Sequence, residues 1–97
     1  MHDSVMLELA AAKAKFPTWP VDPFHALAIL GEEYGELTKA LVEATYEPWK
    51  ADLGDVRKEA IQTAAMALRF VENLDSYRLI ADPAHGVTRN EHEPELI

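Results

Sequence analysis

Apolar residues between Phe24 and Tyr46 recur at alternating three- and four-residue spacing, and no other feature limits the possible folds of this chain as strongly. They are Leu27, Leu30, Tyr34, Leu37, Leu41 and Ala44. At 3.6 residues per turn these positions share one helical face, whereas a half-buried strand would alternate every second residue. The preceding Asp22-Pro23 supplies a helix cap and a first-turn proline. The pattern therefore predicts a long amphipathic helix over residues 24–46.

Two further helices are predicted on either side of this one. The first runs to about Phe16 and is ended by FPTWPVDP, which has three prolines in eight residues. Glu47-Pro48-Trp49 ends the central helix, and a third helix over residues 52–75 carries apolar positions on one face: Leu53, Val56, Ala60, Ala64, Ala67, Val71 and Leu74. Because the connection is short, the two long helices should form an antiparallel hairpin.

The predicted organisation is one all-α domain over residues 1–80, with at most a short helix at 76–81, and a polar tail over residues 81–97. A chain of 97 residues can bury only a modest core. A second apolar patch on the third helix, at Ile61, Ala65 and Leu68, would need additional cover. We therefore expect a homodimer or homotetramer.

Composition excludes several classes of function. The net charge is -8 and no basic cluster occurs, which argues against binding of polymeric nucleic acid. No segment has the length and apolar character of a membrane span or the features of a signal peptide, so no membrane partner is expected. The chain has no cysteine, which excludes thiolate chemistry and suits a reducing cytoplasm. A small anion bridged by a metal ion remains a possible ligand.

The stretch GEEYGEL places three glutamates within the central helix. Glu33 and Glu36 fall on a stripe bordering the apolar face, while Glu32 lies further toward solvent. On the third helix a similar stripe contains Asp52, Asp55, Glu59, Gln62 and Met66. Glu36 lies twelve residues before Pro48 and Glu59 eleven residues after it, so an antiparallel hairpin should place them at the same height.

Facing carboxylates repel one another unless they protonate or share a cation. Ligands that are all oxygen favour Mg²⁺, with Mn²⁺ as a possible substitute. The alternative is that these glutamates are ordinary solvated charges of two helices.

The sequence Glu32-Glu33-Tyr34-Gly35-Glu36, followed by Glu59-Ala60-Ile61-Gln62, resembles the MazG-like all-α nucleoside triphosphate pyrophosphohydrolases. The likeness covers roughly residues 19–72 and is closest to the small phage-type or MazG-related members. It implies a helical bundle of four-helix type completed by oligomerisation. It also implies magnesium-dependent hydrolysis of a ribo- or deoxyribonucleoside triphosphate to the monophosphate and pyrophosphate. The related phosphoribosyl-ATP pyrophosphatases have a more acidic second motif than this chain.

By this resemblance, Glu33, Glu36 and Glu59 would be metal ligands and catalytic residues. Glu32 would be a further ligand or would position the attacking water. Gln62 stands where the family's ExxD pattern has aspartate, so it could coordinate through its amide oxygen but adds no charge. Asp55, on the same stripe, could substitute for the missing carboxylate.

Five residues are candidates for contacts with the substrate: Trp19, His25, Lys39, Trp49 and Lys58. The tryptophans could stack on a base or plug the ends of a bundle. His25 could contact the ligand or lie at the edge of the core, and the lysines could neutralise phosphates or pair with nearby acids. The alternative function is a catalytically weakened nucleotide-binding or helical dimerisation module with a degenerate metal site.

Overall fold

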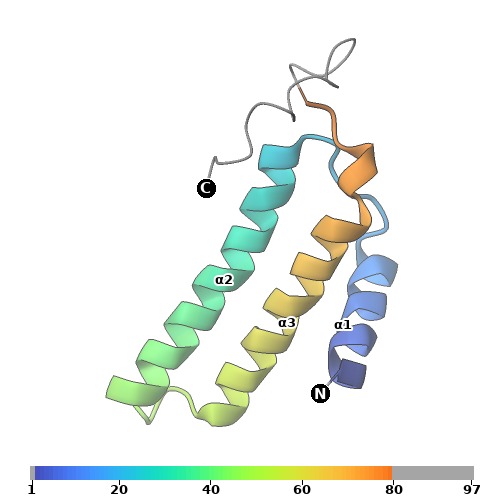
Figure 1. Cartoon of the computed structure of the whole chain (residues 1–97). Coiled ribbons are helices and arrows are strands. Elements are labelled where there is room, and N and C mark those ends of the chain that lie inside the picture. The colour runs from blue at the N-terminus through green and yellow to red at the C-terminus, as the bar shows by residue number, and fades with distance from the viewer. Residues whose placement is uncertain (1, 80–97) are drawn as a thin grey trace.

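The computed structural model describes residues 2–79, which are all-helical and contain no strand (Figure 1). The elements are α1 (His2–Lys15), α2 (Pro23–Tyr46), α3 (Leu53–Glu72) and a short 3₁₀ helix, η1 (Leu74–Ser76). The expected all-α class and the three helices are confirmed within this part of the chain. No helix in residues 2–79 is long and apolar enough to cross a membrane.

The end of the hairpin differs from the prediction. The third helix ends at Glu72, three residues before the expected boundary, and η1 follows it at Leu74–Ser76. The helix expected at 76–81 is not formed over 77–79, and its last residues lie outside the described range, as does the predicted tail. Asn73 explains the early stop, because its side-chain amide donates to the Arg69 carbonyl at 2.9 Å and satisfies a terminal acceptor.

Aspartates fix the starts of both long helices. The Asp22 carboxylate accepts from the main-chain N–H of Phe24 at 2.9 Å, and Pro23 occupies the first turn. At α3, Asp52 and Asp55 form a reciprocal capping box with bonds of 3.1 and 2.9 Å. Asp55 is therefore engaged in starting α3, and it does not line the hollow that contains Glu33 and Gln62.

Helix α3 lies between the other two helices (Figure 1). Helix α2 runs antiparallel to it through the turn at residues 47–52, as predicted, and α1 packs along its other side. The buried core lies where α1 meets α3, at Leu9, Ala65 and Met66. In the stripe that the sequence assigned to an oligomer interface, Ala65 has no exposed surface, whereas Leu68 is 37% exposed.

The apolar face predicted for α2 is only partly covered. Leu30 packs against the core, but Leu27, Tyr34 and Leu41 are each more than half exposed. The reason is that α2 turns the neighbouring stripe, which contains the buried Ala26 and Ala40, toward α3, since small side chains allow a close approach of the helices.

A buried arginine joins α1 and the following linker to α3. Arg69 is only 4% exposed, and its guanidinium donates to the main-chain carbonyls of Ala12, Phe16 and Thr18 at 3.5, 2.6 and 3.3 Å. It also lies over the ring of Trp19, 4.9 Å from the centroid. The Ala12 carbonyl also accepts from the main-chain N–H of Phe16 at 2.8 Å, whereas the carbonyls of Phe16 and Thr18 belong to the segment that follows α1. Arg69 thus fixes how the chain continues after α1.

Replacing Arg69 should reveal how much of the stability depends on this junction. Arg69→Met keeps an apolar stem but leaves the carbonyls of Phe16 and Thr18 without this donor, so we expect a loss of about 2 to 4 kcal/mol in the free energy of unfolding. The exposed Arg57 on the same helix provides the control, since Arg57→Met should change stability by less than about 0.5 kcal/mol. Urea unfolding followed by circular dichroism measures both, and equal effects would show that the Arg69 bonds are unimportant.

Candidate functional site

A cleft of about 640 Å³ lies over α3, between α1 and α2. Its floor is formed by Gln62, Met66 and Arg69 of α3. The α1 side and the linker supply Glu8, Ala11, Ala12, Lys15, Phe16, Thr18, Trp19 and Pro20, and α2 supplies His25, Ile29, Glu32 and Glu33. All three helices therefore contribute to one concave surface.

One end of this cleft is acidic. Glu8, Glu32 and Glu33 line it together with Gln62. Burial raises the pKa of Glu33 above its ordinary value, and the negative charges of Glu59, Glu36, Glu32 and Glu8 raise it further. The carboxyl of Glu33 is thus the point where the negative charge of three helices converges.

A hydrogen bond between the helices sets the register of this acidic end. The hydroxyl of Thr63 donates to the carbonyl of Glu59 on its own helix at 2.8 Å and lies 3.1 Å from the carbonyl of Glu33 on α2. Because α2 and α3 are antiparallel, a residue three positions after Glu33 on α2 lies at about the same height as a residue three or four positions before Thr63 on α3. Glu36 and Glu59 therefore lie at similar height, in agreement with the spacing in the sequence.

The other end of the cleft is aromatic and also carries the cations Lys15 and Arg69. Phe16, Trp19, Pro20 and His25 line it where the linker joins α2. The indole N–H of Trp19 donates to the hydroxyl of Tyr77 at 2.8 Å, and that hydroxyl donates to the carbonyl of Phe70 at 3.0 Å. Trp19 also packs against the core cluster. Its position is therefore fixed by contacts within the protein.

The acidic and aromatic ends of the cleft are more than two helical turns apart. His25 and Glu33 are eight residues apart on α2, which corresponds to about 12 Å of helical rise. On the opposite wall, Glu8 and Phe16 have the same separation in sequence. An elongated ligand with one flat aromatic end and one anionic end matches this arrangement, provided that a cation screens the carboxylates.

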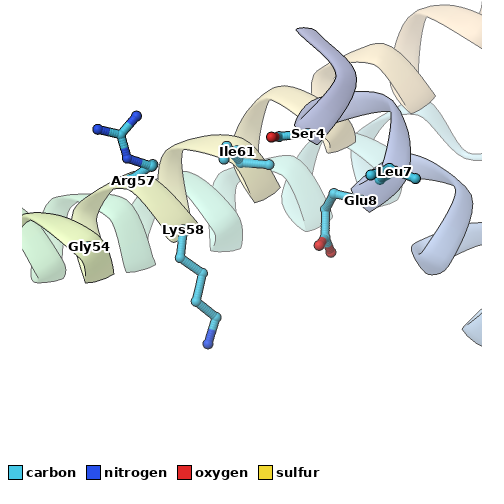
Figure 2. Close-up of a pocket in the computed structure, with 7 residues that line it drawn as sticks. All are labelled: Ser4, Leu7, Glu8, Gly54, Arg57, Lys58 and Ile61. Atoms are coloured by element: carbon cyan, nitrogen blue, oxygen red, sulfur yellow. The ribbon is translucent and has the colours of Figure 1, made fainter. Parts of the chain in front are cut away.

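A second hollow of about 440 Å³ adjoins the acidic end and shares Glu8 with the cleft. It lies between α1 and the start of α3 and is lined by Ser4, Leu7, Glu8, Gly54, Arg57, Lys58 and Ile61 (Figure 2). Glu8 and Lys58 extend to the same side of the helices, whereas Arg57 points away from them (Figure 2). Lys58 is thus near the acidic end without forming an ion pair with any residue that the structure describes.

The structure brings together only part of the predicted site. Trp19, His25, Glu32, Glu33 and Gln62 all line the cleft. Glu36 and Glu59 do not line it, although their charges act on Glu33. Lys58 lies in the adjoining hollow, Lys39 is exposed on α2 outside both hollows, and Trp49 lies in the α2–α3 turn with 76% of its surface exposed.

The donor set suits a hard divalent cation. The acidic end offers carboxylate oxygens and the amide oxygen of Gln62. Its glutamates take part in neither of the two ion pairs found within residues 2–79. No three His, Asp or Glu side chains within residues 2–79 are grouped closely enough to hold a metal ion by themselves. Mg²⁺ is commonly bound by one or two carboxylates together with substrate phosphates, and an open carboxylate arrangement suits that mode.

Sequence reasoning missed Glu8, Lys15 and Phe16, which line the cleft, and Tyr77, which holds Trp19. Glu8 lies next to Leu9, which is 3% exposed, so a helix with Leu9 facing inward sets Glu8 at the border of the core. The helical pattern of α1 is too weakly amphipathic to show this without α3 in place. Tyr77 follows the last helix, and only the folded chain shows that it meets Trp19, which is 58 residues away in sequence.

Comparisons with protein-family models, with curated proteins and with solved structures gave no match to this chain.

The raised pKa of Glu33 predicts a specific dependence of stability on pH. Because burial and like charges disfavour the carboxylate in the folded state only, Glu33 destabilises the fold at neutral pH, and this effect disappears as the pH falls through its raised pKa. Glu33→Gln should therefore be more stable than the original chain at neutral pH, and the difference should shrink toward about pH 4.5.

Thermal unfolding at several pH values tests this expectation. Glu43→Gln on the same helix is the control for the loss of one carboxylate, because Glu43 does not line the cleft. A constant stability difference for Glu33→Gln across the pH range would contradict the assigned environment of Glu33.

Proposed function

We propose that this protein is a metal-dependent nucleoside triphosphate pyrophosphohydrolase that converts a ribo- or deoxyribonucleoside triphosphate to the monophosphate and pyrophosphate. The observation that carries the proposal is the polarity of the cleft: an aromatic end at Trp19 and His25, and an acidic end centred on Glu33. The resemblance of the EExxE sequence to MazG-like enzymes supports the same reaction.

The acidic end has the composition needed for phosphoanhydride hydrolysis. Mg²⁺ or Mn²⁺ bound there would neutralise the negative charge on the phosphate oxygens. Glu33 would hold the cation together with the substrate phosphates, with Gln62 as a neutral oxygen donor. The resemblance makes Glu36 and Glu59 ligands as well, but they lie outside the cleft and are not grouped with Glu33 closely enough to hold an ion without the substrate. Glu32 would orient the attacking water, and Glu8 adds a carboxylate from α1.

The remaining candidates would bind the substrate. His25 lies at the aromatic end, where it can contact the base or sugar, and Lys58 lies beyond the acidic end, where it can contact the outer phosphates. Lys39 and Trp49 lie outside the cleft of this chain, so a role for either would require the surface of a second subunit.

Exposed apolar surface supports assembly into a homodimer or homotetramer. Leu27, Tyr34 and Leu41 lie on the side of α2 facing away from the cleft, and all three are more than half exposed. On α3, Leu53 and Val71 likewise face away from Gln62 and are 73% and 62% exposed. Pairing of such stripes between copies would complete a four-helix arrangement and leave the cleft accessible.

The position of Gln62 favours a second candidate function. Gln62 lines the cleft itself, so the residue that departs from the ExxD pattern lies in the candidate site and not at its edge. An amide in this position lowers the negative charge available for a cation. The second candidate is therefore a nucleotide-binding or dimerisation module with weakened catalysis.

Pyrophosphate release from a panel of ribo- and deoxynucleoside triphosphates distinguishes the two candidates. We expect release from at least one nucleotide with Mg²⁺ or Mn²⁺, and none after addition of chelator. Nucleotide binding without release, by a folded sample, would support the binding module and contradict the enzyme.

Replacement of Glu36 tests the proposed ligand set. Glu36→Gln retains the side-chain volume and removes one charge, so kcat/KM should fall by at least the roughly 10- to 100-fold that loss of a supporting group costs at a metal site. Glu43→Gln, one further heptad along α2, should retain activity. If Glu36→Gln is as active as the original chain, Glu36 is not a ligand.

A further inference from the structure

We propose that Phe16, at the end of α1, is the aromatic residue that stacks on the nucleobase. This inference rests on the proposed function for the identity of the ligand. Phe16 lies outside both motifs that carry the resemblance, Glu32–Glu36 and Glu59–Gln62. The proposal assigns to Phe16 the stacking contact that the sequence suggested for a tryptophan.

The two tryptophans are poorly placed for stacking. Trp19 has Arg69 over its ring, packs against the core cluster and uses its N–H in the bond to Tyr77. Trp49 lies in the turn beyond Tyr46, which is about 31 Å of helical rise from His25. Trp19 therefore serves as a fixed wall, and Trp49 is outside the cleft.

Phe16 combines the two properties that stacking requires. It lines the cleft, and 60% of its surface is exposed, so much of the ring is accessible to a ligand. Its carbonyl accepts the shortest of the Arg69 bonds, at 2.6 Å, which fixes the main chain that carries the ring. An accessible ring on a fixed backbone can stack with little loss of conformational entropy.

Lys15 adds a cation to the same position. Its ammonium group lies 5.4 Å from the centroid of the Phe16 ring and also lines the cleft. The ammonium lies over one face of the ring, so a base would stack on the other face, and the exposed lysine can also move to contact an anionic group of the ligand. The α1 end thus offers an aromatic surface and a positive charge, about 12 Å from Glu8 along the helix.

Calorimetric binding of two probes in the presence of Mg²⁺ tests the proposal. The first is a nucleoside triphosphate analogue with a non-hydrolysable α,β-imido bridge, and the second is tripolyphosphate, which has no base. Phe16→Ala should weaken binding of the nucleotide analogue by roughly 5- to 150-fold, the range expected for loss of one base–aromatic stack. Binding of tripolyphosphate should not change.

Phe24 supplies a matched control, because it is 76% exposed and lies near the linker but does not line the cleft. Phe24→Ala should bind both probes as the original chain does. Within the site, Phe16→Tyr retains an aromatic ring and should retain affinity, whereas Phe16→Leu retains bulk without the ring and should not.

Each other outcome has a definite meaning. Unchanged nucleotide affinity in Phe16→Ala, or equal loss of both probes, overturns the role of Phe16 while leaving pyrophosphate release by the original chain as independent support for the proposed function. Nucleotide binding by the original chain without pyrophosphate release contradicts the enzyme, and a loss of affinity in Phe16→Ala that is confined to the nucleotide analogue then still supports base stacking on Phe16. Failure of the original chain to bind either probe overturns both proposals.

Discussion

The contact of Arg69 with the main chain of α1 and its linker is the interaction on which the rest of the structure depends. A guanidinium that is almost fully buried must satisfy its donors within the protein, and here three carbonyls do so. The same side chain forms part of the cleft floor and lies over the ring of Trp19. One residue of α3 thus positions α1, the linker and the aromatic wall.

Much of the hairpin is predictable from local sequence. Alternating spacing of apolar residues, the cap Asp22 and the break at Pro48 define where α2 begins and ends, because these signals act over a few residues. Asp52, expected on the acidic stripe, instead caps α3. The inner face of α2 is less predictable. Both Leu27 and Ala26 are apolar, and only contact with α3 decides that the smaller side chain turns inward.

The candidate site shows the same limit. The charge pattern indicates Glu33 and the level pairing of Glu36 with Glu59, since both follow from helical geometry within one hairpin. The contributions of Glu8 and Phe16 come from a helix that docks across more than fifty residues of sequence, and no periodicity encodes that contact. Whether Gln62 is a neutral ligand or the mark of a weakened site is a question of affinity, which residue spacing does not determine.

The position of α1 also links ligand binding to folding. Contacts of α2 with α3 form across a short turn, whereas docking of α1 must close a loop that spans 57 residues between Ala12 and Arg69. The cleft has one of its walls only when α1 is docked. Any ligand that contacts both walls therefore binds only the state in which α1 is docked, and it stabilises that state by mass action. Ligand binding and the docking of α1 are thus thermodynamically coupled.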